Sequence, residues 1–168
     1  KYKKKIKNEL NKIYKKIFFN NKFFVHRDFH VSNIMPIKNK LGIIDTQDAI
    51  LGNPMYDVAS LIDDVRTKVP SQIKKRTLQY YLKNCSLRHK PMHLLQNDFD
   101  ILSVQRNLKI LGIFYRLYKR DKKPQYLKYL PYTWKLIELR MKNKIFTNLS
   151  ILLSKVVNTK LRTKKNFK

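Results

Sequence analysis

Three polar residues in the first third of the chain have the spacing of a phosphoryl-transfer site. His26-Arg27-Asp28 is followed by Asn33, and Asp45 comes twelve residues after Asn33. This chemistry needs a carboxylate to receive the proton of an attacking hydroxyl, and oxygen donors to hold Mg²⁺ on the nucleotide phosphates. We therefore predict Asp28 as the base, and Asn33 and Asp45 as the metal ligands, since Mg²⁺ prefers hard oxygen atoms.

The distribution of acidic residues supports this prediction. The chain has 38 Lys+Arg against 11 Asp+Glu, and six of the eleven acids lie between residues 28 and 64. Asp also favours turns and helix starts, and this preference is an alternative explanation for Asp48, Asp63 and Asp64. That alternative does not account for the spacing of the two carboxylates and the amide in the motif.

Two histidines accompany the motif. His26 precedes the predicted base, and this position predicts that it braces the loop rather than titrates. His30 lies two residues after Asp28, where a histidine more often positions a group or contacts the substrate than transfers a proton. Arg27 is compatible with an ion pair or with an exposed position.

Composition limits the class of protein. The 168 residues suffice for one domain with a real core, and the single cysteine suits a reducing compartment, so we expect a cytoplasmic protein. No apolar run approaches membrane-spanning length, and no signal-peptide pattern is visible. The net charge of +27 comes mostly from lysines spread over the whole chain, whereas specific nucleic-acid readers use arginine, so we predict no nucleic-acid partner.

Hydrophobic periodicity predicts a mainly helical fold with one small β-hairpin. Residues 3–19 have the pattern of a basic amphipathic helix, which fits a membrane surface or, as we favour, a core-facing position. The remaining elements are expected as strands at 23–25, 34–37 and 41–44, helices at 56–66, 72–84, 98–119 and 145–157, and a helix at 125–140 broken near Pro131. Residues 158–168 are expected to form a frayed basic tail.

One half of a complete phosphotransferase is not visible. A Gly-x-Gly-x-x-Gly loop and a strand lysine should precede the catalytic loop, but only 25 residues precede His26. The chain starts at Lys1 and not at Met, and its sequence pattern is already under way at that point. We therefore expect a piece of a longer protein whose nucleotide-binding N-lobe is missing, and we expect the isolated chain to be inactive.

The residues after the motif carry a resemblance to a known family. Protein kinases have Asp-Phe-Gly at the second metal site, where this chain has Asp45-Thr46-Gln47-Asp48-Ala49, followed by a Gly52-Asn53-Pro54 turn and Asp57. This pattern resembles the aminoglycoside phosphotransferase and choline kinase superfamily, although the usual turn is Gly-Pro. The resemblance implies the C-terminal lobe of the protein-kinase-like fold, ATP and Mg²⁺ as cofactors, and a loop-bracing role for Asp57.

A longer pattern is similar to one branch of that superfamily. His26 to His30, Gln47-Asp48-Ala49 and Gln105 to Phe114 resemble the bacterial N-acetylmuramate/N-acetylglucosamine 1-kinases of cell-wall recycling. The resemblance implies phosphorylation of the anomeric hydroxyl of an N-acetyl amino sugar. It also implies a substrate-contact set, which is His30, Gln47, Asp48, Gln105 and Arg106.

The expected organisation is a kinase-like C-lobe at residues 1–157, with a catalytic loop at 25–33, a metal-binding Asp45 and a helical subdomain at 56–157. Kinases of the aminoglycoside, choline or homoserine type, and protein kinases, remain alternatives for the substrate. A non-catalytic relic that acts as a binding module is the alternative from another class, but such a relic has no reason to keep Asp28, Asn33 and Asp45.

Overall fold

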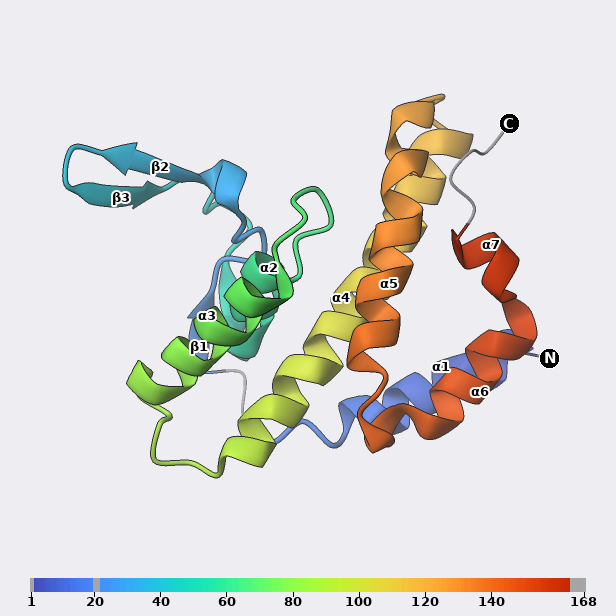
Figure 1. Ribbon diagram of the computed structural model, residues 1–168, viewed down its shortest axis with the longest axis horizontal. Coiled ribbons are helices and arrows are strands. Elements are labelled where there is room, and N and C mark those ends of the chain that lie inside the picture. The colour runs from blue at the N-terminus through green and yellow to red at the C-terminus, as the bar shows by residue number, and fades with distance from the viewer. Residues whose placement is uncertain (1, 20–21, 164–168) are drawn as a thin grey trace. The chain divides into compact units, whose positions relative to one another are not determined.

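The computed structural model of the chain describes residues 2–19 and 22–163. Strands within these residues are β1 (Phe23–Val25), β2 (Ile34–Ile37), β3 (Lys40–Ile43) and β4 (Ile50–Gly52). The α-helices there are α1 (Tyr2–Tyr14), α2 (Met55–Ile62), α3 (Ser71–Asn84), α4 (Met92–Lys119), α5 (Leu130–Arg140), α6 (Thr147–Val156) and α7 (Thr159–Thr163). Short 3₁₀ turns are η1 (Val31–Asn33), η2 (Pro124–Tyr129) and η3 (Lys144–Phe146). The fold is mainly α with a small β part, as predicted (Figure 1).

The chain forms two compact units, which are described separately. The loop unit comprises Phe18–Ser103, and the helical unit comprises Lys1–Ile17 together with Val104–Lys168. The boundary between them falls inside α4. The N-terminal helix therefore belongs to the same unit as the C-terminal helices.

Two antiparallel strand pairs shape the loop unit. β2 pairs with β3 in the predicted hairpin, with Ile34 opposite Ile43 and Ile37 opposite Lys40. β1 pairs with β4, a strand that the sequence did not predict, with Phe23 opposite Gly52. In Figure 1 the β2–β3 hairpin projects as an arm from the rest of its unit. The catalytic loop therefore begins at the end of one strand pair and leads into the other.

The helices of the loop unit pack through apolar and ionic contacts. α2 contacts α3, and Met55, Ala59 and Ile62 of α2 are buried. Just after α2, the buried Asp63 accepts a 2.8 Å bond from Lys74 Nζ and a 2.6 Å bond from Ser103 Oγ. A buried carboxylate requires such partners, so the role of Asp63 is structural.

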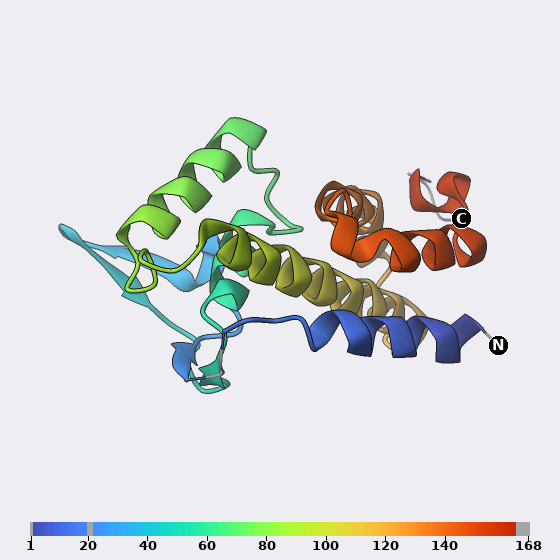
Figure 2. The ribbon, with the colours of Figure 1, turned by 90° about the horizontal axis from the view of Figure 1, so that it is seen from below.

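The helical unit contains segments from both ends of the chain. α1 contacts α6, and both views show the two helices side by side (Figures 1 and 2). Ile13 of α1 is buried, whereas Lys3, Lys4 and Lys5 are exposed. The core-facing interpretation of this amphipathic helix is therefore the one that the structure supports. The predicted break near Pro131 is confirmed, because α5 begins at Leu130 with this proline in its first turn.

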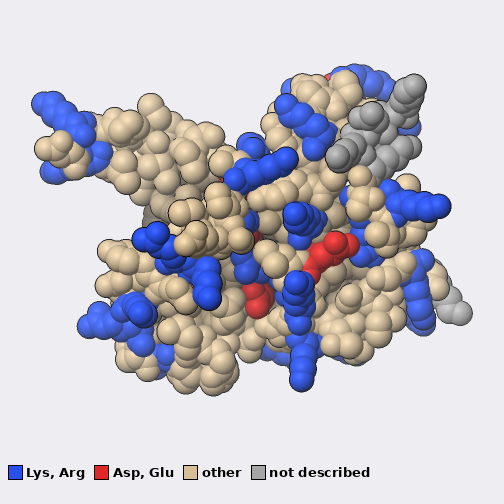
Figure 3. Space-filling model, viewed as in Figure 1, with Lys and Arg blue, Asp and Glu red and all other residues tan. Residues whose placement is uncertain are grey.

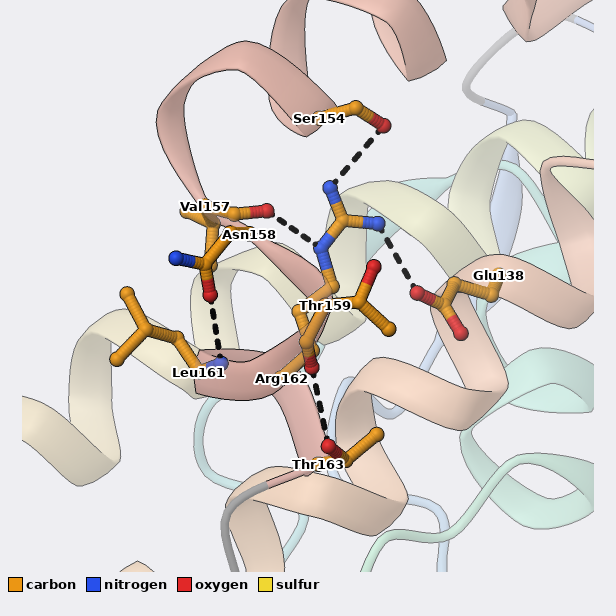
Figure 4. A network of polar contacts seen from close by, with 8 residues as sticks. All are labelled: Glu138, Ser154, Val157, Asn158, Thr159, Leu161, Arg162 and Thr163. Carbon is orange, nitrogen blue, oxygen red and sulfur yellow. Dashed lines mark hydrogen bonds and ion pairs between the residues drawn. The ribbon is translucent and has the colours of Figure 1, made fainter.

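The C-terminal segment is ordered beyond the predicted end of the fold. Residues 159–163 form α7, where we expected a frayed tail, while residues 164–168 of that tail lie outside the described residues. The guanidinium of Arg162, which is only 7% exposed, donates to the Val157 carbonyl at 2.8 Å and to Glu138 at 3.0 Å (Figure 4). It also donates to Ser154 Oγ at 3.3 Å and lies 5.1 Å from the centre of the Trp134 ring. These contacts hold α7 against α5 and α6. The lysine-rich sequence of this segment shows no pattern from which they could be predicted.

We expect Arg162→Ala to lower the free energy of unfolding by about 1–3 kcal/mol, because the half-buried Val157 carbonyl loses its donor and the buried Arg162 side chain loses its packing on Trp134. The ion pair contributes little of this, since the Glu138 side chain is 46% exposed. Arg162→Lys should restore only part of it, because an ammonium cannot reproduce the planar fork. Urea unfolding followed by circular dichroism measures the change. Lys160→Ala, on the exposed side of α7, is the matched control and should stay within about 0.5 kcal/mol. Equal stability of Arg162→Ala and wild type would contradict the anchoring role.

Lys and Arg side chains are scattered over the face in view and do not gather in one patch (Figure 3). Within residues 2–19 and 22–163, no helix combines the length and the apolar character that crossing a membrane requires.

Candidate active site

The catalytic loop is built around a buried histidine. His26 follows β1 and is 2% exposed. Its Nδ1 accepts the backbone N–H of Asp28 at 3.3 Å, and its Nε2 lies 2.8 Å from the carbonyl oxygen of Ile44. A backbone N–H can only donate and a carbonyl can only accept, so both contacts are satisfied by the neutral ring with the proton on Nε2. The imidazole thus joins the loop to the segment that carries Asp45.

Asp57 holds the backbone of the same loop. One carboxylate oxygen accepts the N–H of His26 at 2.7 Å, and the other accepts the N–H of Arg27 at 3.0 Å. Asp57 lies in the first turn of α2, where a negative charge is favourable. Arg27 has a positive φ of 73°, a conformation that costs free energy in a non-glycine residue. The two bonds to Asp57 help to stabilise that strained position, and they are the contacts that a loop-bracing residue requires.

The three residues of the motif lie together. Asn33 donates from Nδ2 to the Asp28 carbonyl at 3.0 Å and to Asp45 Oδ2 at 3.4 Å. The backbone adds a further link, because the N–H of Ile44 donates to the Asn33 carbonyl at 3.1 Å. Asp28 and Asp45 are exposed and Asn33 is half-buried, so the site faces outward. The η1 turn and the β2–β3 hairpin bring an amide and a carboxylate together that are twelve positions apart in sequence.

The donor atoms fit a magnesium ion. With Nδ2 of Asn33 directed at the Asp28 carbonyl, the Oδ1 atom is the one left to act as a ligand, and Asp45 supplies a carboxylate. Asp45 has a φ of 69°, so its backbone occupies the left-handed region that favours Gly, Asn and Asp. No group of three His, Cys, Asp or Glu in the described part of the chain is arranged to hold a metal. Mg²⁺ commonly takes one or two carboxylates and completes its shell with phosphate oxygens and water, so this donor set suffices.

The structure places the predicted substrate contacts in two groups. His30 is half-buried and its backbone N–H donates to the Asp28 carbonyl at 3.0 Å. Gln47 is exposed and donates from Nε2 to Asp45 Oδ1 at 2.6 Å, and the carbonyl of Asp48 accepts from Arg27 at 3.1 Å. These three residues belong to the loop unit.

The other two residues of that set belong to the helical unit, on α4. Gln105 is exposed, while the Arg106 side chain is only 4% exposed. A side chain this buried has little surface to offer a ligand. Gln105 therefore has the freer access to solvent of the two.

A tyrosine lies near the carboxylate that holds the loop. Burial is the main cause that raises the pKa of the Tyr81 phenol to about 12, and electrostatic interactions with Cys85 and Asp57 contribute to the same rise. The phenol therefore stays neutral at physiological pH. Tyr81 consequently adds no negative charge beside Asp57.

Sequence reasoning missed three contributors to the site. The carbonyl of Ile44, as a backbone group, leaves no signal in a sequence. Asn53 and Asp98 bond to each other at 2.8 Å from Nδ2 to Oδ2, and both are buried. Asp98 did leave a signal, because it lies among Leu94, Leu95, Phe99 and Leu102, where a charged residue is out of place unless it has partners.

Comparison with known proteins defines the class. Residues 20–93 match the phosphotransferase enzyme family. This segment contains the whole catalytic loop, Asp45 and Asp57, and it belongs to that family. The family resemblance predicted from the motifs is thereby confirmed, and the loop unit has the C-terminal-lobe fold of kinase-like phosphotransferases.

Individual relatives share a longer stretch. The chain is 36% identical over 119 residues to the N-acetylmuramate/N-acetylglucosamine kinase of Pseudomonas aeruginosa, which is 68% of this chain and 35% of that protein. It is 35% identical over 114 residues to the protein of the same name from Pseudomonas putida, and 34% identical over 114 residues to that from Neisseria meningitidis. The chain spans about a third of the length of these curated relatives.

Proposed function

We propose that the protein containing this chain transfers a phosphoryl group from ATP to a hydroxyl of a small molecule. The observation that carries the proposal is the position of the Asn33 amide, which lies within hydrogen-bonding distance of both the Asp28 carbonyl and the Asp45 carboxylate. One amide thus links the backbone of the Asp28 residue to the carboxylate of Asp45, in a chain that has few acids. This arrangement has no evident use in stability, because Asp28 and Asp45 are exposed.

The residues have separate roles in the proposed reaction. The acceptor oxygen bonds to the γ-phosphorus, the bond to the departing ADP oxygen breaks, and the acceptor's proton goes to the Asp28 carboxylate. Asn33 and Asp45 would hold Mg²⁺, which when bound neutralises charge on the phosphates. His26 and Asp57 keep the loop backbone in place through the contacts described above. Positioning of this kind supplies most of the catalysis in phosphoryl transfer.

The proposed acceptor is the anomeric hydroxyl of an N-acetyl amino sugar, in the cytoplasm and in the recycling of cell-wall sugars. The names of the relatives support this substrate, as do the polar side chains around the loop. His30, Gln47 and Asp48 would supply donors and acceptors to the sugar, and Gln105 and Arg106 remain candidates from the resemblance. A choline site would need an aromatic cage around the cation. An aminoglycoside site would need a surplus of carboxylates, and this chain has few acids beyond residue 64.

The nucleotide is proposed to bind a further lobe of the whole protein. The β2–β3 hairpin supports this view, since its apolar side chains Met35, Ile37, Leu41 and Ile43 are exposed. Exposed apolar groups next to a catalytic loop are typical of a surface that another part of the protein covers. The 168 residues alone would then hold the base and the metal ligands without the groups that position ATP.

A substrate panel on the whole protein tests the proposal. We expect ATP-dependent phosphorylation of N-acetylmuramate or N-acetylglucosamine at the anomeric oxygen, with kcat/KM at least ten-fold above that for choline, homoserine or kanamycin. Phosphorus NMR of the product identifies the phosphorylated oxygen. The 168-residue chain should give no turnover in the same assay. Preference for kanamycin or choline would overturn the substrate and keep the kinase, whereas sugar binding without turnover of any acceptor would favour the non-catalytic module.

A further inference from the structure

One buried carboxylate of the loop unit has three N–H partners. Asp98, in the N-terminal half of α4, has no exposed surface. Its Oδ1 accepts the backbone N–H of Phe18 at 2.8 Å, and its Oδ2 accepts the backbone N–H of Phe19 at 3.0 Å. The Nδ2 of Asn53 donates to the same Oδ2 at 2.8 Å. A carboxylate that accepts three such bonds is well satisfied in a buried position.

The partners of Asp98 are two segments that are distant in sequence. Phe18 and Phe19 belong to the stretch that leads into β1. Asn53 follows β4, and its Oδ1 accepts the N–H of Met55 at 2.9 Å, so the side chain also fixes the first turn of α2. Its Nδ2 makes a second, longer contact of 3.4 Å with the carbonyl of Phe19. Asp98 and Asn53 thus join the stretch before β1 to the start of α2.

Both segments lead to the catalytic loop. β1 runs directly into His26, and α2 carries Asp57, which accepts the N–H groups of His26 and Arg27. We propose that Asp98, through Asn53, is a positioning residue for the catalytic loop. Asp98 fixes the start of α2 relative to the segment before β1, and this arrangement allows Asp57 on α2 to hold the loop. This inference rests on the proposed function for its effect on turnover, but its structural part stands independently of it.

The choice of residue supports this role. Position 98 lies in an apolar stripe, where a leucine would fill the space without the cost of burying a charge. An apolar residue, however, would leave two backbone N–H groups and the Asn53 amide without this acceptor. Directional bonds to two segments fix their relative position more tightly than apolar packing does, because packing is non-directional. Asn53 lies between Gly52 and Pro54, where the usual turn has Gly followed directly by Pro. This additional residue is the one that bonds to Asp98.

Two variants test the link with different severity. Asp98→Asn keeps the shape but turns one acceptor atom into a donor, so at least one N–H group faces an NH₂ group. Asn53→Ser is milder, because a serine hydroxyl can still accept from the Met55 N–H but is too short to reach Asp98. Asp100→Asn is the matched control, since Asp100 is also buried on α4 and its Oδ1 can keep accepting from Gln96.

The first readout is the tautomer of His26, measured by ¹⁵N NMR of the imidazole in the 168-residue chain and assigned with His26→Gln. Wild type and Asp100→Asn should show a single neutral ring protonated at Nε2. In folded Asp98→Asn and Asn53→Ser, the Nδ1 and Nε2 signals should move toward each other, because the loop no longer holds the ring in one arrangement. Folded variants whose His26 signals match those of wild type would overturn the proposal, whatever their melting temperature.

The second readout is the kinetics of the whole protein. Asp98→Asn should lower kcat by about 10²-fold, the scale of a displacement of about 1 Å at a reacting group, while KM changes little. A role confined to stability would lower the melting temperature and leave kcat of the folded enzyme unchanged, which would also overturn the proposal. If the wild-type protein phosphorylates no acceptor, the proposed function fails, and the His26 signals still decide whether Asp98 positions the loop.

Discussion

Asp28→Asn in the whole protein is expected to lower kcat by about two to four orders of magnitude, the usual scale of general acid–base catalysis. The amide cannot receive the proton of the attacking hydroxyl. The fold should be unaffected, since the contacts that hold Asp28 use its backbone: its N–H donates to His26, and its carbonyl accepts from His30 and Asn33. Initial rates at saturating sugar and ATP measure the effect.

Two further measurements give this prediction its control. ATP affinity should change by less than about three-fold, because Asp28 is assigned to the acceptor and not to the nucleotide. Asp121→Asn makes the same chemical change at a half-buried residue of the helical unit, which bonds to the neighbouring Arg120, and should leave kcat unchanged. Turnover near the wild-type value in Asp28→Asn would remove Asp28 from the reaction.

Asp45→Asn is expected to raise the Mg²⁺ concentration for half-maximal activity by about 100-fold or more. Loss of a group that merely supports a metal ligand already costs about 10–100-fold, and Asp45 is the proposed charged ligand itself. Asparagine is chosen over alanine because the φ of 69° at this position is tolerated by Asn and strained in Ala. Asn33→Ala removes a neutral ligand, so a smaller shift of about ten-fold is expected.

The measurement is a Mg²⁺ titration of initial rates for each variant at fixed ATP. High Mg²⁺ should restore part of the activity of both variants, which a simple loss of folded protein would not allow. If both titrations coincide with that of wild type, the metal ligands lie elsewhere in the whole protein. The His26 tautomer provides the structural control, since a loop that keeps its place leaves those signals unchanged.

The polar part of the site could be predicted from sequence because its chemistry imposes a spacing. A base, an amide and a second carboxylate must meet around one phosphate, and a hairpin between Asn33 and Asp45 is a short way to bring the last two together. Each strand of this hairpin has four residues and includes isoleucine and other apolar residues, enough to show a pattern. The roles assigned to these residues are predictions that the variants above address.

Other parts of the fold had no readable pattern. β4 has only three residues and ends in glycine, so it shows no alternation, and its pairing with β1 depends on a contact between segments about 25 positions apart. The beginning of α4 at Met92 was missed because His93, Asn97 and Asp98 interrupt its apolar stripe. α7 was missed because a run of lysines surrounds Arg162, whose partners come from two other helices.

The outer edges of the β2–β3 hairpin carry features that oppose assembly of the chain with copies of itself. Within the described residues each of its strands pairs only with the other, so the outer edges offer backbone groups to any passing strand. Pro36 removes one donor from the edge of β2, and Lys38 and Lys40 place two positive charges at the turn. The two charges and the missing donor thus oppose edge-to-edge pairing of this apolar hairpin with another copy. The opposition from the charges weakens at high ionic strength, because salt screens the lysines.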